Sequence, residues 1–375
     1  MRVTGIETLG FRNLADATLE LGDGVTLLRG ANGAGKTNAL EALYAALAGR
    51  SPRTRNEREL IRFGEPVART EAEITDGAEK RRFLFAIERS AERRHLLDGA
   101  ATTPEHSALR PPLSLFMPDR LALVKGPPAG RRAHLDRFCA ALWPARDDAR
   151  RRYGRALAQR NALLGRIRAG AAREDSLEAW ELELGTSGIE LMECRSDAVE
   201  TLAASFADAA ARLGFGAAGK LAYRPRSEAS EPGELAAELS ERRPRDIERG
   251  FTTHGPHLDE LAIDRDGRPL RRYGSQGQQR TGLLALLFAE STALGGAGRS
   301  QPLLLLDDVT SELDPDARRR LVEMLDATGG QAIVTATEPE QLPPGRGERT
   351  EVRLSEGAET SLEAVGEPAA GLEAA

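Results

Sequence analysis

Residues 30 to 37 read Gly30-Ala31-Asn32-Gly33-Ala34-Gly35-Lys36-Thr37. This spacing matches G-x-x-x-x-G-K-[ST], a loop whose backbone N–H groups cradle phosphates. A strand-like apolar run precedes the loop at residues 25–28, and apolar residues at helical spacing follow it over residues 40–47. In this context Lys36 is expected to reach the β and γ phosphates, and Thr37 to ligate Mg²⁺. The stretch predicts a nucleoside-triphosphate site at a helix N-terminus.

A second motif reads Leu303-Leu304-Leu305-Leu306-Asp307-Asp308. An apolar run of this length predicts a buried parallel strand, and the carboxylates then lie at its C-terminal end, where ligands bind in open α/β sheets. Asp307 is suited to hold Mg²⁺, directly or through water. Asp308 is suited to polarise a water for attack on the γ-phosphate. A purely structural role is disfavoured because buried, unpaired charge is costly.

A third motif lies about 30 residues before the acidic strand and contains Ser275, Gln276, Gly277 and Gln278. It is a small, hydroxyl-bearing turn ahead of a predicted helix over residues 281–293, and such a turn forms an anion site. One subunit does not need two such sites for one triphosphate.

The remaining sequence predicts ordinary α/β elements. Strand patterns cover residues 3–9 and 17–21, and two further strands flank Asp76-Gly77, a hairpin-turn pair. Asp314 and Pro315 are typical of a helix start, with aspartate as N-cap and proline at the first helical position.

The composition is that of a globular protein, with 375 residues, 40% hydrophobic residues, 29% charged residues and a net charge of −6. The apolar stretches are too short to span a bilayer and no signal peptide is expected, so we predict a cytoplasmic protein without a membrane partner. Residues 354–375 carry five glutamates and no base, which leaves the rest of the chain nearly neutral and predicts a disordered tail.

Neither the cysteines nor the histidines predict a metal centre. Cys139 and Cys194 lie in separate helical segments without ligand spacing. His254 and His257 flank a Gly-Pro pair and have no acidic or thiol partner at ligand spacing.

Together the motifs resemble those of ABC-type ATPases, in which Ser-x-Gly-Gln precedes an acidic strand. The form Ser275 to Arg280 looks like that of the RecF family. Further blocks resemble the same family, in the same order: Gly10-Phe11-Arg12-Asn13, residues 35–42, Arg50-Ser51-Pro52-Arg53-Thr54, residues 123–126, Gln159-Arg160-Asn161, Gly255-Pro256-His257 and residues 306–314. Leu258 departs from the arginine that the family usually has after Gly-Pro-His.

The resemblance implies an ABC-type ATPase head, a mixed α/β lobe with an inserted, mainly helical second lobe. The expected division is 1–110 for the first part of lobe I, 111–250 for the helical lobe, 251–350 for the rest of lobe I, and 351–375 for the acidic tail. It adds Arg12, Asn13 and Asn38 to the ATP site and makes Lys36 and Asp308 the catalytic residues.

It further implies an ATP-dependent homodimer in which Ser275 to Gln278 cap the γ-phosphate held by the opposite copy. The closed dimer would clamp DNA at single-strand gaps and junctions and promote recombinase loading, with RecO and RecR as partners. Slow, DNA-stimulated hydrolysis would then release the DNA.

Basic residues near the loop and at the start of the helical segment are candidate DNA contacts, namely Arg53, Arg55, Arg131 and Arg132. The alternative is that these arginines form solvated surfaces. Three other functions stay open: a transporter nucleotide-binding subunit, an SMC-type head, and a scaffold that ATP switches with negligible turnover. The roughly 240 residues between the loop and the third motif are too many for the transporter subunit, and an SMC-type head needs hundreds of coiled-coil residues there.

Overall fold

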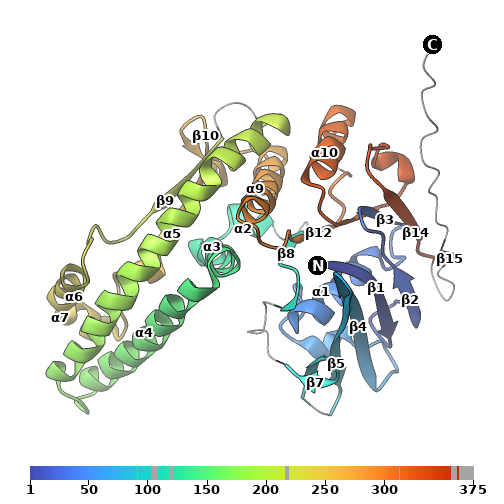
Figure 1. The fold of residues 1–375 in the computed structure, drawn as a ribbon. Helices are drawn as coiled ribbons and strands as arrows, with labels where there is room; N and C mark the ends of the chain where they lie inside the picture. The colour runs from blue at the N-terminus through green and yellow to red at the C-terminus, as the bar shows by residue number, and fades with distance from the viewer. Residues whose placement is uncertain are drawn as a thin grey trace. The chain divides into compact units, whose positions relative to one another are not determined.

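The computed structural model describes residues 1–90, 92–102, 109–117, 121–215, 219–311, 313–355 and 361–362. The chain forms two compact units, Met1–Arg120 with Ser300–Ala375, and Leu121–Arg299 (Figure 1). The second unit was expected to cover residues 111–250. It covers Leu121–Arg299 instead. The segment 251–299 belongs to the helical unit because its strand and its long helix pair and pack there.

An antiparallel sheet forms one layer of the first unit. Its order is β2-β1-β4-β5-β6-β7. The strands are β1 (Arg2–Leu9), β2 (Ala17–Glu20), β4 (Val67–Asp76), β5 (Glu79–Glu88), β6 (Arg94–Leu97) and β7 (Ala100–Ala101). The predicted hairpin is confirmed, since Asp76 pairs with Glu79 and Gly77 adopts the positive φ of 63° that such a turn requires.

A second, mainly parallel sheet carries the strands next to the sequence motifs, in the order β15-β14-β3-β13-β12-β8. Its strands are β3 (Val25–Arg29), β8 (Leu113–Phe116), β12 (Leu303–Leu306), β13 (Ala332–Ala336), β14 (Arg349–Arg353) and β15 (Ser361–Leu362). β12 pairs in parallel with both β8 and β13. All four of its leucines are buried, which confirms the predicted buried parallel strand.

Two helices of this unit begin where the sequence predicts. α1 (Lys36–Ala48) starts directly after the phosphate loop. α10 (Pro315–Thr328) starts after Asp314, whose side chain accepts a hydrogen bond from the Ala317 backbone N–H at 2.8 Å. Glu312, inside the motif before α10, and most of the acidic tail lie outside the described residues.

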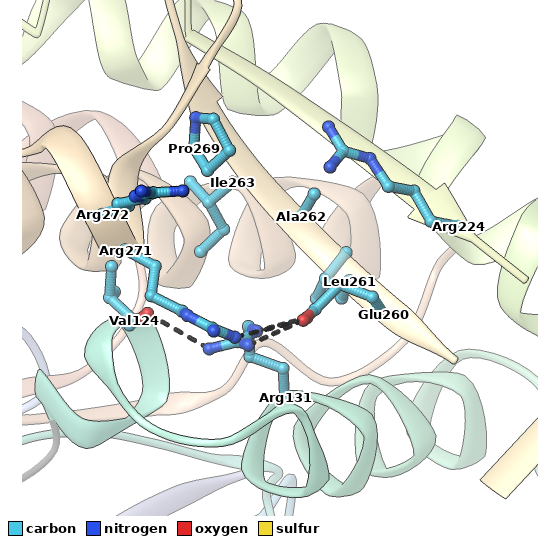
Figure 2. Close-up of a pocket in the computed structure, with 10 residues that line it drawn as sticks. All are labelled: Val124, Arg131, Arg224, Glu260, Leu261, Ala262, Ile263, Pro269, Arg271 and Arg272. Carbon is cyan, nitrogen blue, oxygen red and sulfur yellow. Dashed lines mark hydrogen bonds and ion pairs between the residues drawn. The ribbon is translucent and has the colours of Figure 1, made fainter. Parts of the chain in front are cut away.

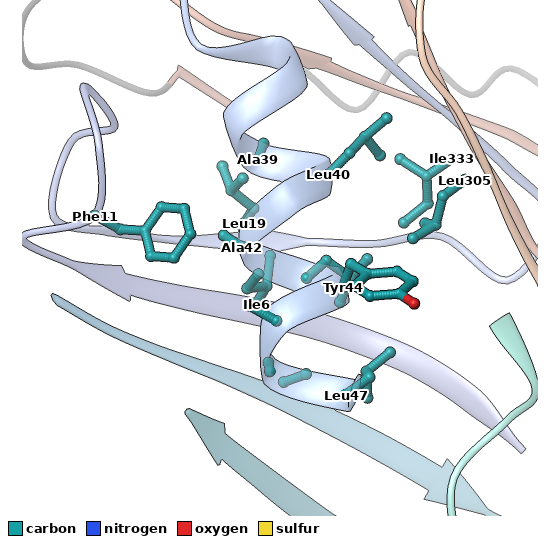
Figure 3. Close-up of a cluster of buried hydrophobic side chains, with 14 of the residues drawn as sticks. Ile6, Phe11, Leu19, Ala39, Leu40, Ala42, Tyr44, Leu47, Leu305 and Ile333 are labelled. Atoms are coloured by element: carbon teal, nitrogen blue, oxygen red, sulfur yellow. The ribbon is translucent and has the colours of Figure 1, made fainter. Parts of the chain in front are cut away.

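Helix α1 is buried on all sides rather than on a single stripe. Every residue from Ala39 to Ala48 is buried. Side chains of both sheets surround the helix, with Ile6 and Phe11 on one side and Leu305 and Ile333 on the other (Figure 3). The predicted amphipathic stripe was therefore too narrow, because α1 packs against both sheets. The loop before it is therefore anchored to a helix that is buried from Ala39 to its end.

The second unit is built around the 35-residue helix α5 (Glu178–Arg212), against which α4, α6, α9 and β9 pack (Figure 1). Its other elements are α2 (Ala122–Lys125), α3 (Pro128–Leu142), α4 (Asp147–Arg168), β9 (Gly219–Arg224), α6 (Pro232–Glu241), α7 (Arg243–Arg249), β10 (Glu260–Arg265), β11 (Arg268–Pro269), α8 (Leu270–Tyr273) and α9 (Gln276–Gly296). β9, β10 and β11 form a small antiparallel sheet. Among the described residues, no helix has the length and apolarity needed to cross a membrane.

A buried polar cluster holds the helices of this unit together. Arg160 is fully buried and donates to Glu181 at 3.1 Å and to Asp246 at 2.7 Å, and also to the Thr252 hydroxyl and the Leu239 carbonyl oxygen. Every charge in the cluster is therefore paired, as buried charges must be.

Candidate phosphate-binding site

The phosphate loop joins β3 to α1 and folds tightly on itself. The Lys36 amine donates to the carbonyl oxygens of Gly30 at 2.7 Å and Ala31 at 2.9 Å. Gly35 has φ 96°, and a Cβ there would lie 2.7 Å from the side chain of Leu14, so only glycine fits. Burial lowers the pKa of Lys36, while Asp308 and Asp307 act in the opposite direction. The cation is thus held over the loop, where the charges of both carboxylates act on it.

The acidic strand end meets the loop at Thr37. The Thr37 hydroxyl donates to the two carboxylate oxygens of Asp307 at 3.0 and 2.9 Å. The Thr335 hydroxyl, at the end of β13, donates to the same carboxylate at 2.8 Å. Asp307 is 3% exposed and makes no ion pair with any described residue. Burial raises the pKa of Asp307, and the charge of Asp308 raises it further.

The donor set around Asp307 fits the predicted Mg²⁺. A carboxylate and a hydroxyl are the oxygen ligands that Mg²⁺ prefers. A buried carboxylate without an ion pair also gains from a cation that supplies the missing charge.

Asp308 has an unusual backbone conformation, with φ 49°. A non-glycine residue at positive φ is strained, and such residues cluster at functional sites. The conformation is held by a hydrogen bond from the Asp308 N–H to the Thr335 hydroxyl at 2.8 Å. Its carboxylate makes no hydrogen bond or ion pair with the described residues and is therefore available to a water molecule.

A buried carboxylate that we did not predict, Glu41, organises the other side of the loop. It is fully buried on α1 and accepts two hydrogen bonds from the Arg12 guanidinium, at 3.0 and 3.1 Å. Arg53 and the Ser51 hydroxyl donate to it at 3.0 and 2.6 Å. A glutamate inside the Ala/Leu run of residues 39–48 marks this position in the sequence, but the local sequence does not identify its partners.

The two asparagines assigned to the site by resemblance lie beside this cluster. Asn13 donates to the Gly33 carbonyl oxygen at 2.7 Å, and Asn38 donates to Asn13 at 2.7 Å. Arg53 donates to Asn38 at 2.8 Å. The loop and the residues expected beside it are thus joined into one hydrogen-bonded network.

The signature segment, Ser275 to Gln278, belongs to the second unit. Ser275 is the N-cap of α9, and its hydroxyl accepts from the Gln278 N–H at 3.2 Å while the Gln278 side chain accepts from the Ser275 N–H at 2.9 Å. The helix therefore begins at Gln276, not at residue 281 as expected, because this capping box starts it earlier. Ser275, Gln276 and Gly277 are exposed, so the helix start is open to a ligand.

The candidate DNA contacts divide into two groups. Arg53 and Arg55 are exposed on the loop after α1, and Arg55 makes no ion pair with the described residues. Arg131 is 3% exposed and fully hydrogen-bonded, so its prediction as a DNA contact is corrected: its donors are engaged inside the unit. Arg132 is half-buried and donates to the Asp259 carbonyl oxygen at 2.7 Å.

The two histidines make ordinary internal hydrogen bonds. His257 contacts the Tyr153 hydroxyl at 2.8 Å and the Thr252 carbonyl oxygen at 3.0 Å, and His254 contacts Glu238 at 2.6 Å. Leu258 is 42% exposed beside them.

A phosphate loop and an acidic strand end on one parallel sheet, with a second unit that carries the signature segment, define an ABC-type ATPase head. The chain belongs to the RecF/RecN/SMC N-terminal domain family, whose model matches residues 2–356, and within it to the RecF family.

Comparisons with known proteins carry this assignment. The chain is 38% identical to the DNA replication and repair protein RecF of Anaeromyxobacter sp. (strain Fw109-5), with 95% of this chain and 98% of the relative covered. It is also 38% identical to RecF of Deinococcus radiodurans, with 92% of each chain covered.

Solved structures agree. The recombination mediator protein RecF with ATP, described in the RecFOR pathway, superposes with a TM-score of 0.82 at 25% identity, and covers 97% of each chain. An SMC head bound to the C-terminal winged-helix domain of ScpA has a TM-score of 0.61 at 15% identity over 97% of this chain and 98% of that one, which shows a shared fold alone.

Proposed function

We propose that the protein is a cytoplasmic, ATP-dependent DNA-binding protein of recombinational repair and replication restart. The observation that carries the proposal is the contact between the Thr37 hydroxyl and the Asp307 carboxylate at 2.9 Å, because it joins the phosphate loop to the acidic strand. The RecF family supplies the biological context, since its curated relatives are named DNA replication and repair proteins.

In this proposal ATP binds along residues 30–38, with Arg12 and Asn13 beside the loop. Lys36 neutralises the β and γ phosphates, and Thr37 and Asp307 hold Mg²⁺, which screens the phosphate charge. Asp308 orients the attacking water in line with the leaving group. The positive φ of Asp308 supports this role, since residues held in this sparsely populated backbone region cluster at functional sites.

The signature segment completes the site of a second copy. The exposed N–H groups at the start of α9 bind the γ-phosphate held by the opposite phosphate loop, so ATP closes a homodimer. DNA binds the closed dimer at single-strand gaps and junctions, recombinase loading follows, and slow hydrolysis releases the DNA. Arg53 and Arg55 contact the backbone phosphates, and RecO and RecR are the partners, in keeping with the RecFOR pathway named for the RecF structures.

Size-exclusion chromatography with light scattering tests the dimer, and turnover with and without gapped duplex DNA tests the activity. Asp308→Asn should trap an ATP-bound dimer and lower turnover by on the order of a hundredfold or more. Asp316→Asn is the matched control, since this exposed aspartate forms its ion pair with Arg319 on the surface of α10.

A monomer that persists with ATP would contradict the shared site. Turnover that gapped DNA does not raise, together with no salt-sensitive DNA binding, would favour a scaffold that ATP switches.

A further inference from the structure

The second unit contains a cavity of about 220 Å³ beside strand β10 (Figure 2). Arginines from three elements line it: Arg131 of α3, Arg224 of β9, and Arg271 and Arg272 of α8. Glu260 is the one carboxylate among the lining residues. Figure 2 shows Arg271 and Arg272 on one side of β10 and Arg224 on the other.

Arg131 already neutralises Glu260. Its guanidinium donates to the Glu260 carboxylate at 2.6 and 3.0 Å. It also donates to the carbonyl oxygens of Leu123, Val124 and Gly126, at 3.0, 3.1 and 2.9 Å. This arginine is therefore a structural clamp between α2 and β10 and leaves the cavity with no net negative charge.

The other three arginines have guanidinium N–H groups that make no hydrogen bond to the described residues. Arg224 pairs with Asp264 at 2.7 Å, and Arg271 reaches Glu260 only at 3.6 Å. Arg272 has no carboxylate partner among the described residues, and its guanidinium carbon lies 5.5 Å from the centre of the Tyr273 ring. The cavity wall thus carries more positive than negative charge, which favours the binding of an anion.

We propose that this cavity binds a phosphate group, with Arg271 and Arg272 as its main ligands and Arg224 as the third. Guanidinium groups donate paired hydrogen bonds to phosphate oxygens, and their number suits a tetrahedral anion better than a planar carboxylate. The apolar part of the wall, which includes Ala262, strengthens these charge interactions.

The size of the cavity restricts the ligand. Its volume of about 220 Å³ lies below the roughly 300–1,000 Å³ of sites that enclose a drug-sized ligand. It therefore accommodates a phosphate or pyrophosphate group rather than a whole nucleotide. The group comes either from a free phosphate compound or from a nucleic-acid backbone, and the nucleic-acid source rests on the proposed function.

The position of the cavity links it to the signature segment. Arg271 and Arg272 precede Ser275 by only a few residues, and Gln279 of α9 donates to the carbonyl oxygens of Leu270 at 3.2 Å and Gly274 at 3.0 Å. The arginine-bearing turn and the first turn of α9 are thereby tied together. A phosphate bound in the cavity fixes the helix start that would contact ATP.

The test uses the full chain with Lys36→Ala, so that the phosphate loop no longer competes for the probe. Calorimetric titration with inorganic pyrophosphate should give one site per chain. Arg272→Gln should weaken that binding by on the order of tenfold or more, because it removes charge-assisted hydrogen bonds. Arg268→Gln is the matched control, since this exposed arginine of β11 lies outside the cavity and changes the charge equally.

A second titration with a short single-stranded oligonucleotide separates the two sources. If the oligonucleotide also loses affinity with Arg272→Gln, the phosphate belongs to a nucleic-acid backbone. If only pyrophosphate binding falls, the ligand is a free phosphate compound. If neither probe distinguishes Arg272→Gln from Arg268→Gln, the proposal is wrong, whatever the outcome of the ATP-dependent dimer experiment.

Discussion

At the scale of single residues, burial of Asp307 makes its ionised carboxylate unfavourable in the folded protein. Its folded pKa is raised from the ordinary value of 3.8, so the folded state binds a proton more tightly than the unfolded chain. The free energy of unfolding therefore falls as the pH rises from about 3.8 through the raised folded value. Asparagine has no charge to bury, so Asp307→Asn removes this pH-dependent decrease in the free energy of unfolding. It should therefore raise the melting temperature of the ligand-free protein at neutral pH by about 2 °C or more.

The difference in melting temperature between Asp307→Asn and the parent should be smallest near pH 4 and should grow towards pH 7. The same variant should lose most of the stabilisation that Mg²⁺ and ATP give the parent, because a neutral amide is a poor ligand for Mg²⁺. Thermal melts over this pH range, with and without MgATP, measure both effects. A variant that is less stable than the parent at every pH would show that the hydrogen bonds of the carboxylate outweigh its burial.

Residues with a motif could be predicted from the sequence, whereas residues that act through tertiary contacts could not. Thr37 and Asp307 lie 270 positions apart, yet the motif and the strand-end rule brought both to one site. Glu41 has no motif of its own, and its partners come from two separate loops. From the sequence, Arg131 and Arg160 could not be distinguished from solvent-exposed arginines. The carboxylates that pair with them in the folded protein, Glu260 and Asp246, lie far away in the sequence.

At the scale of elements, the start of α9 combines helix capping with the proposed contact to the γ-phosphate. Ser275→Ala removes the cap and should cost about 1 kcal/mol of stability. Ser275→Asp keeps a capping oxygen, so its unfolding free energy should stay near that of the parent. Its added charge repels a γ-phosphate, so ATP-dependent dimerisation should be lost. Chemical denaturation and light scattering separate the two properties.

Ser275→Thr is the control for this helix start, because it keeps the hydroxyl and should retain both stability and dimerisation. A Ser275→Asp protein that still dimerises with ATP would mean that the start of α9 does not meet the γ-phosphate.

Strands and the starts of α1 and α10 were more predictable than the start of α9 or the extent of burial. The two strands around the Asp76-Gly77 turn pair were predicted, although they extend further than expected, over Val67–Asp76 and Glu79–Glu88. The start of α10 was predicted from Asp314 and Pro315. The burial of α1 on every side depends on strands that lie far along the chain, so its local pattern showed only one face.

At the scale of the whole molecule, the division of the chain depends on pairings that no local pattern reveals. The family resemblance led us to expect residues 251–299 in the first lobe. They belong to the second unit because β10 pairs with β9, which follows α5. The fold class itself was predictable, since three motifs in order resemble one architecture.

The proposed dimer makes a prediction that concerns two copies at once. A Lys36→Ala chain has a defective phosphate loop but an intact signature segment, and a Ser275→Asp chain has the reverse, so each alone should be inactive. Neither variant should form a homodimer with ATP, whereas chains mixed in equal amounts can form heterodimers with one intact composite site of two, so turnover should recover to at most roughly half of the parent value if the two sites act independently. If the phosphate loop and the signature segment served one nucleotide within a single chain, mixing would restore nothing. Differently labelled chains report heterodimer formation by energy transfer, so an absence of recovery in a mixture that does form heterodimers with ATP would refute the shared site.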